Sequence, residues 1–497
     1  MDPEILRSSF AVVERRAEFA VKYFYSHLFR HNPDVRGLFP LDFPEDMERQ
    51  RDRLFAALTH VVERLEDPAL PHYLRDLGRD HRKYLAEPDH YAAVGASLIA
   101  AFATVSGSAW NAEVEKTWSE AYGAITNVML QGAWEAQHEG EPPWWDAEVV
   151  ARTRYGDDLV LLTLRPHRPL PHTPGQYVSV NCPHLPGIWR PYSLANAPRA
   201  DHTVDLHISL VEDGVLSTAL VRQTRKGDTL RLGAPGGSLV LRAPEGRPLT
   251  FIAAGTGWAP VKALLEQLAE GYEEREEHEA YEEYGERDGV GTGAAGGADE
   301  AGGIGGAGTA GGSGGAASAG TADGGGGAVR AGGAAGSPGG PAAPGARGAA
   351  RRPTGLRNTG SRDSAPEARL FLVARDTSSL YDRSAVERLQ ARLPWLAVTF
   401  ITPAPGRPKA QATERLLTAL GNRANWARHD VYLAGPPKLV EEIGEALPTL
   451  GTAPERIFHD ILPPTGQSRT RPLGTAEWLL DRPQPNWHNP SGRAPNA

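Results

Sequence analysis

The sequence predicts a multidomain protein in which an all-α region is followed by an antiparallel β-barrel and then by an α/β domain with a parallel sheet. The chain has 497 residues, which is too long for one hydrophobic core. Its apolar residues have helical spacing up to about residue 140, then the spacing of short strands, and from residue 249 strands alternate with helices. These two changes of period indicate three folded regions.

Composition narrows the classes of protein to consider. Cys182 is the single cysteine, so neither an internal disulfide nor a thiolate metal cluster is expected, and a reducing, cytoplasmic compartment fits this content. No stretch approaches the roughly 18 uninterrupted apolar residues of a membrane span. The net charge of −9 comes mainly from residues 270–288, which hold ten acidic and two basic side chains. The nearly neutral remainder gives no electrostatic support for nucleic-acid binding.

Residues 1–140 carry only helical patterns. Asp2 is suited to cap a first helix that has Pro3 at its first position. Two apolar faces follow, one formed by Ile5, Val12, Phe19, Tyr23 and Leu28 and the other by Tyr91, Val94, Leu98, Phe102 and Val105. His81 lies on a third such stripe, with Leu74, Leu77 and Leu85. A neutral imidazole there can ligate haem iron, but a histidine on an apolar stripe is more often a core residue, so the pattern alone leaves both interpretations open.

The two later regions differ in their predicted secondary structure: the first contains strands alone, and in the second strands alternate with helices. Residues 145–246 contain short β-rich runs that are broken by Gly, Pro and Asp, which is typical of a barrel; the runs are 159–164, 176–180, 204–210 and 229–232. Residues 247–463 predict a parallel sheet with helices on both faces. Its strands are expected at 249–254, 369–374, 396–401, 430–434 and 456–460, and its helices at 259–270, 383–393, 411–420 and 437–447.

A long insertion interrupts the α/β domain between its first helix and its second strand. Residues 289–350 contain 26 glycines in 62 positions and few large apolar side chains. Such a segment buries too little surface to offset its chain entropy. Together with the acidic run before it, it predicts a disordered insertion over about 274–366. The Pro-, Arg- and Asn-rich tail, 464–497, is also expected to be loose.

A glycine loop follows the first strand of the α/β domain. Gly255-Thr256-Gly257-Trp258-Ala259-Pro260 joins an apolar strand to a helix. Glycines let the backbone approach a pyrophosphate, whose negative charge is favoured at a helix N-terminus. This short motif is weak evidence by itself. The later turn Ala434-Gly435-Pro436, which also follows a strand, supports a dinucleotide site.

The helical region resembles the globin domain of bacterial flavohaemoglobins. The match is carried by residues 24–33 (FYSHLFRHNP), by 50–55 (QRDRLF), and by His81 with 88–95 (PDHYAAVG). The resemblance implies haem b as a cofactor, with His81 as the axial iron ligand and Tyr91 in its hydrogen-bond network. It also implies a dioxygen pocket in which Tyr25 donates a hydrogen bond, Gln50 assists, and Phe39 and Leu54 form walls.

One position departs from the family pattern. The family places a glutamate in the network of the axial histidine, and Ala133 stands at that position here. Glu135 is two residues further along, about 200° around a helix, and is therefore expected to face another way. Loss of the carboxylate weakens the donor strength of the histidine.

The rest of the chain resembles the ferredoxin-reductase-like module of flavohaemoglobins and of oxygenase reductases. The segment 174–177 (PGQY), which includes Gln176 and Tyr177, is followed by Arg190-Pro191-Tyr192-Ser193, which we interpret as a flavin loop. The resemblance implies FAD, with Arg190 at its pyrophosphate, Tyr192 against the ring system and Ser193 at the reactive ring nitrogen. A second phosphate-binding turn would be formed by residues 214–218, including Gly214 and Ser217.

The dinucleotide motifs fit the same module. NAD(P)H would bind at Gly255, Thr256, Gly257 and Pro260, with Ala434, Gly435 and Pro436 over the nicotinamide. Ala434 replaces the cysteine usual in the family, and Leu462 stands where an aromatic side chain is usual; both changes could alter nicotinamide positioning. Arg375, at a strand end, could contact the dinucleotide or be an ordinary solvated residue.

The expected function is that of a flavohaemoglobin-type nitric oxide dioxygenase, in which electrons pass from NAD(P)H to FAD and then to haem. Dioxygen and nitric oxide are its expected small-molecule substrates, and no nucleic-acid partner is expected. Two alternatives remain. The first is a haem-based dioxygen binder or redox sensor with a slow reductase, which is motivated by Ala133 in place of the family's glutamate. The second is a reductase whose globin is silent. The choice between NADH and NADPH and the oligomeric state stay open.

Overall fold

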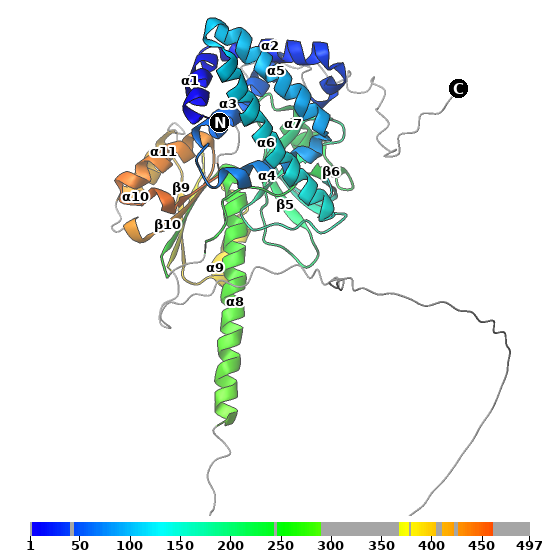
Figure 1. Cartoon of the computed structure of the whole chain (residues 1–497). Coiled ribbons are helices and arrows are strands. Elements are labelled where there is room, and N and C mark those ends of the chain that lie inside the picture. The colour runs from blue at the N-terminus through cyan, green and yellow to red at the C-terminus, as the bar shows by residue number, and fades with distance from the viewer. Residues whose placement is uncertain are drawn as a thin grey trace, which may run out of the picture. The chain divides into compact units, whose positions relative to one another are not determined.

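The structure is a computed structural model that describes residues 2–39, 44–242, 246–289, 367–376, 379–403, 410–421 and 426–460. It contains the three kinds of domain that the sequence predicts, in the predicted order. Helices occupy the first region, an antiparallel sheet the second and a parallel sheet the third. Figure 1 shows them coloured from blue to orange along the chain.

The helical region consists of long helices joined by short 3₁₀ turns. Their bounds are α1 (Pro3–Glu14), α2 (Ala17–His31), α3 (Pro44–Glu63), α4 (Leu70–His81), α5 (Pro88–Ser106) and α6 (Ala112–His138). The Asp2 carboxylate accepts from the Glu4 N–H at 2.9 Å, which confirms the predicted cap. The first predicted apolar face is confirmed at Leu28, which is fully buried, but not at Phe19. The chain breaks between α1 and α2, so the two helices do not share one continuous stripe. Phe19 on α2 is 54% exposed, and α1 buries Leu6 and Phe10 rather than Ile5 and Val12.

Helix α5 carries the second predicted apolar face into the core of this region. Leu98, Phe102 and Val105 are buried, together with Tyr91. By length and composition the segment Pro88–Ala109 could also cross a membrane. Its buried side chains pack against α1, α2 and α6, as expected for the core helix of a globular domain.

Two glycines allow α4 and α6 to approach each other closely. A Cβ atom on Gly78 would overlap the carbonyl group of Met129, and one on Gly132 would overlap the carbonyl group of Arg75. Backbone atoms cannot move aside as a flexible side chain can, so both positions require glycine. This crossing holds the end of α4, and with it His81, against α6.

We expect Gly132→Ala to destabilise the helical region by about 1–3 kcal/mol, the usual cost of overpacking a core. Gly123→Ala, on the same helix, is the matched control because a Cβ atom there meets nothing within 4 Å. The midpoint of thermal unfolding of the full chain, monitored by circular dichroism, is compared between the two variants. The expectation is wrong if both variants melt like the wild-type protein.

The antiparallel sheet closes into a barrel. Its strands are β1 (Trp145–Tyr155), β2 (Leu159–Pro166), β3 (Tyr177–Asn181), β4 (Trp189–Ser193), β5 (Val204–Ser209) and β6 (Thr229–Leu232), in the order β4-β3-β6-β1-β2-β5. A bridge between Leu194 and Leu206 joins the two ends of this order. The expected flavin loop is in fact strand β4. Pro191 is tolerated there because β4 pairs along its length with β3, and its bridge toward β5 lies beyond the proline, at Leu194.

The parallel sheet has the order β11-β10-β7-β8-β9. Its strands are β7 (Leu249–Ala254), β8 (Ala368–Val373), β9 (Leu396–Ile401), β10 (Asp430–Ala434) and β11 (Ile457–Phe458), and its helices are α8 (Trp258–Gly289), α9 (Arg383–Arg392), α10 (Ala410–Gly421) and α11 (Pro437–Thr449). Buried side chains form separate clusters on the two faces of the sheet. The sheet is therefore covered on both faces, as predicted.

Helix α8 is longer than expected. The acidic run that we assigned to the start of the disordered insertion continues the helix to Gly289. Glutamate is a good helix former, and the run contains no proline, so helix propensity exceeds the effect of charge repulsion. The Gly/Ala-rich segment and the C-terminal tail, including Leu462, lie outside the described residues.

Candidate functional site

His81 stands at the last position of α4 with one ring nitrogen already engaged. Its Nδ1 lies 2.7 Å from the carbonyl oxygen of Leu77. A carbonyl only accepts, so Nδ1 carries the proton and Nε2 presents a bare lone pair. Burial lowers the pKa of His81, which keeps the ring neutral. This tautomer is the one that a metal ligand requires, so the site fits an axial role toward haem iron.

An aromatic cluster surrounds Tyr25 on α2. Tyr25 is 3% exposed, and its ring meets that of Phe39 edge-on at a centroid distance of 5.5 Å. Leu54, on α3, packs against the hydrophobic core of the helical region, to which Tyr25 belongs. Of the four residues expected around dioxygen, Tyr25 and Phe39 are in contact, and Leu54 lies in the same core. The side chain of Gln50, the fourth, lies outside the described residues.

Tyr91 lies near His81, but no carboxylate among the described side chains joins them. The two ring centroids are 6.3 Å apart, and burial raises the pKa of Tyr91 to about 12. Glu135 accepts a hydrogen bond from the side chain of Gln131 at 2.8 Å, in an exposed position. The glutamate thus faces away, as expected from its offset from Ala133, and the partner of His81 is a backbone carbonyl.

Strands β3 and β4 place the two parts of the predicted flavin motif side by side. They are antiparallel, with Tyr177 opposite Ser193 and Val180 opposite Arg190. Burial is the main cause that raises the pKa of Tyr177 to about 12, and burial also raises the pKa of Tyr192. Both phenols therefore remain protonated donors at neutral pH.

Two turns near these strands depend on glycine. Gly175 has φ +94°, and a Cβ atom there would overlap the carbonyl group of Leu239. The Ser217 hydroxyl accepts from the Val211 N–H at 3.1 Å and lies 3.0 Å from the Gly214 carbonyl, close to where a Cβ atom on Gly214 would stand. The Ser217 hydroxyl is therefore engaged by the backbone of the turn. A phosphate bound at this turn would contact backbone groups before it contacted this hydroxyl.

The two dinucleotide motifs interlock at the carboxyl edge of the parallel sheet. Strand β7 leads into Gly255–Gly257, and the neighbouring strand β10 leads into Gly435. A Cβ atom on Gly257 would overlap the carbonyl group of Ala434, and one on Gly435 would lie 3.0 Å from the Cβ of Ala254. The order of strands reverses between β7 and β10. Ligands of open α/β sheets bind at such a switch point.

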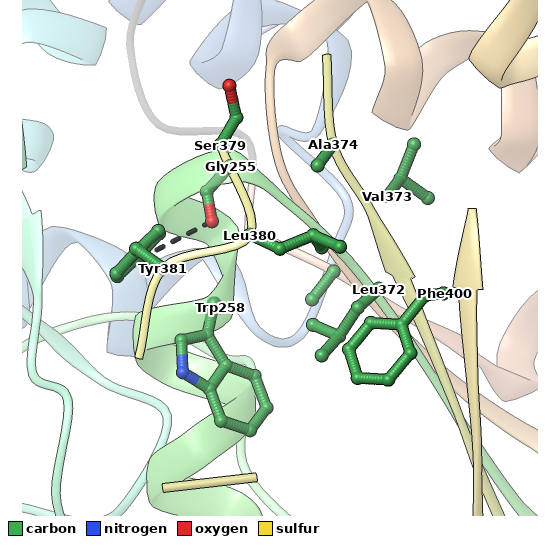
Figure 2. Close-up of a pocket in the computed structure, with 10 residues that line it drawn as sticks. Gly255, Trp258, Leu372, Val373, Ala374, Ser379, Leu380, Tyr381 and Phe400 are labelled. Carbon is green, nitrogen blue, oxygen red and sulfur yellow. Dashed lines mark hydrogen bonds between the residues drawn. The ribbon is translucent and has the colours of Figure 1, made fainter. Parts of the chain in front are cut away.

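A small pocket opens beside the glycine loop (Figure 2). Its walls are mainly apolar, with Trp258, Leu372 and Phe400 among them. Tyr381 points its hydroxyl toward the Gly255 carbonyl, 3.4 Å away, and the same hydroxyl lies 3.0 Å from Nδ1 of His207 on β5. One phenol thus connects the barrel to the glycine loop.

Arg375 faces the barrel. Its guanidinium lies 3.0 Å from the Asp158 carboxylate, and both side chains are about half exposed. The ion pair is consistent with the ordinary interpretation of this arginine. Contact with a dinucleotide stays a prediction.

Sequence reasoning missed a lysine that links the end of α4 to the barrel. Lys83 is 6% exposed, and its Nζ donates to Asp80 and, at 2.8 Å, to Oγ of Ser179 on β3. It also lies 5.7 Å from the ring centre of Trp189 on β4. A lysine two residues after His81 carries no signal of this contact, because its partners are about a hundred positions away.

Comparison with known proteins agrees with this architecture. Residues 22–129 match the family model of the globins, and residues 146–241 match that of the oxidoreductase FAD-binding domain. A flavohemoprotein of Oceanobacillus iheyensis is 27% identical over 289 residues, which cover 54% of this chain and 70% of that protein. A flavohemoprotein of Bordetella pertussis is 28% identical over 290 residues, with coverages of 54% and 71%.

A solved structure shows the same fold. The flavohemoglobin of Malassezia yamatoensis, determined with bound FAD and heme, aligns with a TM-score of 0.60 and 17% identity, over 93% of this chain and 98% of that one. The fold and its motifs define a globin joined to an oxidoreductase module with FAD-binding and parallel-sheet domains. With a globin domain followed by an FAD-binding domain, the chain is similar to these flavohaemoglobins.

Proposed function

We propose that this chain is a flavohaemoglobin that acts as an NAD(P)H-dependent nitric oxide dioxygenase. Nitric oxide, dioxygen and one electron together give nitrate, so each NAD(P)H supports two turnovers. The observation that carries the proposal is the occurrence in one chain of a histidine with a bare Nε2 and of two interlocked glycine loops at a sheet switch point. Bound haem would supply the iron that takes up dioxygen, and bound FAD would divide the two electrons of NAD(P)H into single steps.

The globin residues would bind and orient the gaseous substrates. His81 would hold the iron through Nε2 while the Leu77 carbonyl fixes the ring orientation. Tyr25 would donate a hydrogen bond toward dioxygen from a buried position, where such a bond is stronger than in water. Phe39 and Leu54 would exclude water from the same space. A similar role for Gln50 stays a prediction.

The reductase residues would hold the electron donors. Arg190, with its planar guanidinium, suits the FAD pyrophosphate, while Tyr192 and Ser193 on β4 suit its ring system. The backbone of Gly255–Gly257 would meet the pyrophosphate of NAD(P)H, and Ala434 to Pro436 would close over the nicotinamide.

Consumption of nitric oxide tests the proposal directly. We expect the purified protein, loaded with haem and FAD, to consume nitric oxide rapidly only when dioxygen and NADH or NADPH are both present. Tyr25→Phe should slow this by about 10–100-fold, since a donor aimed at developing negative charge is lost. Tyr23→Phe, on the same helix and only partly buried, is the control. Consumption that dioxygen and NAD(P)H do not accelerate would overturn the proposal.

One observation favours a second candidate function, a dioxygen-binding or redox-sensing globin with a slow reductase. The partner of His81 is the Leu77 carbonyl, and Glu135 bonds to Gln131 instead. A backbone carbonyl raises the donor strength of a histidine less than a carboxylate does. This candidate requires nitric oxide turnover well below the rate at which the same preparation reduces an artificial dye.

A further inference from the structure

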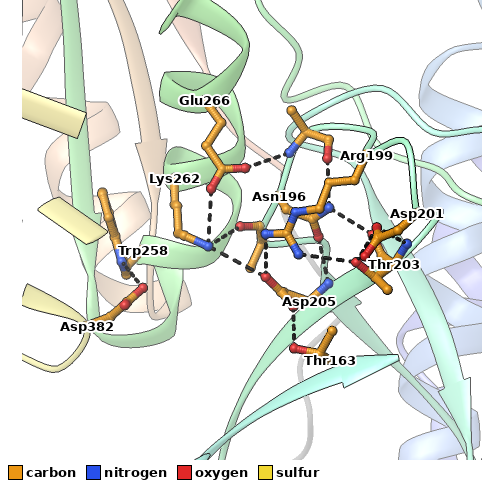
Figure 3. Close-up of polar contacts among 12 residues, drawn as sticks. Thr163, Asn196, Arg199, Asp201, Thr203, Asp205, Trp258, Lys262, Glu266 and Asp382 are labelled. Atoms are coloured by element: carbon orange, nitrogen blue, oxygen red, sulfur yellow. Dashed lines mark hydrogen bonds and ion pairs between the residues drawn. The ribbon is translucent and has the colours of Figure 1, made fainter. Parts of the chain in front are cut away.

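Two side chains of α8 clasp the segment that directly follows strand β4 (Figure 3). Nζ of Lys262 donates to the Ala195 carbonyl at 3.0 Å, and the Glu266 carboxylate accepts from the Ala197 N–H at 3.0 Å. Lys262 and Glu266 are one helical turn apart and are themselves paired at 3.3 Å. One face of a single helical turn therefore holds both ends of a three-residue segment.

A second pair of charges completes this clasp. The Asp205 carboxylate on β5 lies 3.8 Å from Nζ of Lys262 and accepts hydrogen bonds from Thr163 and Arg199, each at 2.7 Å. Burial acts to raise the pKa of Asp205, but the hydrogen bond and the charge of Arg199 bring it below its usual range. Two cations and two anions thus balance at the junction between the barrel and α8.

The clasped segment cannot easily adapt if the clasp is lost. Nδ2 of Asn196 donates to the carbonyl groups of Ala197 and Thr203, at 2.7 and 3.1 Å. Its Oδ1 accepts from the Asp205 N–H at 2.6 Å. The segment 195–197 is therefore fixed to the barrel independently of α8. Lys262 and Glu266 therefore determine where α8 lies relative to the barrel.

Both ends of the clasp lie close to the residues proposed for the electron donors. Lys262 comes five residues after Gly257, about 7.5 Å along a helix, and Ala195 comes two residues after Ser193. We propose that Lys262 and Glu266 are positioning residues for reduction of the flavin by NAD(P)H, because they fix the Gly255–Gly257 loop relative to β4. This inference rests on the proposed function, whose hydride transfer needs the two reacting rings in contact.

Positioning should affect the rate of flavin reduction more than the binding of cofactors. The clasp residues touch neither motif directly, so the dissociation constant of NAD(P)H and the FAD content should change little when the clasp is broken. A displacement of about 1 Å in the relative position of reactants can cost on the order of 100-fold in rate. A purely structural role would instead lower stability or FAD content and leave the rate of the loaded fraction unchanged.

Anaerobic stopped-flow reduction of the flavin in the full holoprotein tests the proposal, with NADH and NADPH each varied to saturation. We expect Lys262→Met to lower the limiting rate constant by about 10–100-fold, and Lys262→Arg, which keeps a charged donor, to recover part of that loss. Lys116→Met is the control, because Lys116 is 77% exposed and lies on α6 of the helical region, outside both motifs. A wild-type limiting rate in FAD-loaded Lys262→Met would overturn the proposal.

Other outcomes separate this proposal from the one on which it rests. If neither NADH nor NADPH reduces the flavin of the wild-type protein, the proposed function fails first. If Lys262→Met does not retain FAD, Glu266→Gln decides, because its amide oxygen still accepts from Ala197 while the charge pair with Lys262 is lost. A reduced limiting rate in FAD-loaded Glu266→Gln supports positioning, and an unchanged rate overturns it.

Discussion

His81→Ala should abolish haem binding while leaving the reductase active. The variant removes the side chain whose Nε2 is available for iron, and no other described histidine shares its place at the end of α4 on the apolar stripe. Haem content should fall from about one per chain to near zero, and nitric oxide consumption should be lost with it. FAD content and NAD(P)H-dependent reduction of an artificial dye should match those of the wild-type protein.

His72→Ala is the matched control for this experiment. His72 lies on the same helix, but its side chain is 81% exposed and pairs with the exposed Asp76. We expect it to keep full haem content. Dye reduction shows that the reductase domains of His81→Ala are folded. Added imidazole should restore part of the haem spectrum by filling the vacated position, which requires a folded globin region. Wild-type haem content in His81→Ala would show that the axial assignment is wrong.

The regular parts of the fold were predictable because their patterns are local. The strands at 249–254, 396–401 and 430–434 begin and end where the apolar runs predict. The strands at 249–254 and 430–434 are fully buried runs, and all three have the length of a strand and are bounded by turn residues. The parallel order of these strands then brings the loops after β7 and β10 together at one edge, so the meeting of the two glycine motifs also follows from topology.

The missed elements are those whose pattern is not periodic. Strand β1 has a bulge between Val149 and Ala151, which breaks the alternation of apolar and polar residues. Strand β4 contains Pro191, a residue that usually argues against a strand. The extension of α8 to Gly289 carries acidic side chains with no apolar face to reveal it. In the two strands, pairing with neighbouring strands outweighed the local pattern. In α8, helix propensity outweighed the absence of an apolar face.

The motifs of the candidate site could be predicted from the sequence, but the buried lysines that hold its elements in place could not. An apolar stripe and a family pattern predicted His81 as a candidate ligand, but no sequence signal indicated the lysines that lie near the motifs. Lys83 contacts Ser179, and Lys262 contacts Ala195, at separations of 96 and 67 positions. Only the tertiary structure brings these groups together. On the sequence, each resembles an ordinary surface lysine.

Gly257→Ala should nearly eliminate reduction of the flavin by NAD(P)H. A Cβ atom there would overlap the Ala434 carbonyl and approach the Gly435 nitrogen, so one of the two interlocked loops must move. The nearest atoms that the new Cβ would meet all belong to the backbone, so the overlap cannot be relieved by moving a side chain. A shift of about 1 Å between nicotinamide and flavin should cost on the order of 100-fold in dye reduction.

A glycine on α8, the helix that follows the loop, provides the control for this substitution. Gly271 is exposed on α8, and a Cβ atom there meets nothing within 4 Å. Gly271→Ala should leave dye reduction unchanged and stabilise the helix by up to about 1 kcal/mol, since alanine loses less backbone freedom on folding. Haem content should be the same in both variants, because neither glycine lies in the globin region. If FAD-loaded Gly257→Ala reduces the dye at the rate of Gly271→Ala, the glycine loop does not position the nicotinamide, and the dinucleotide must bind elsewhere on the chain.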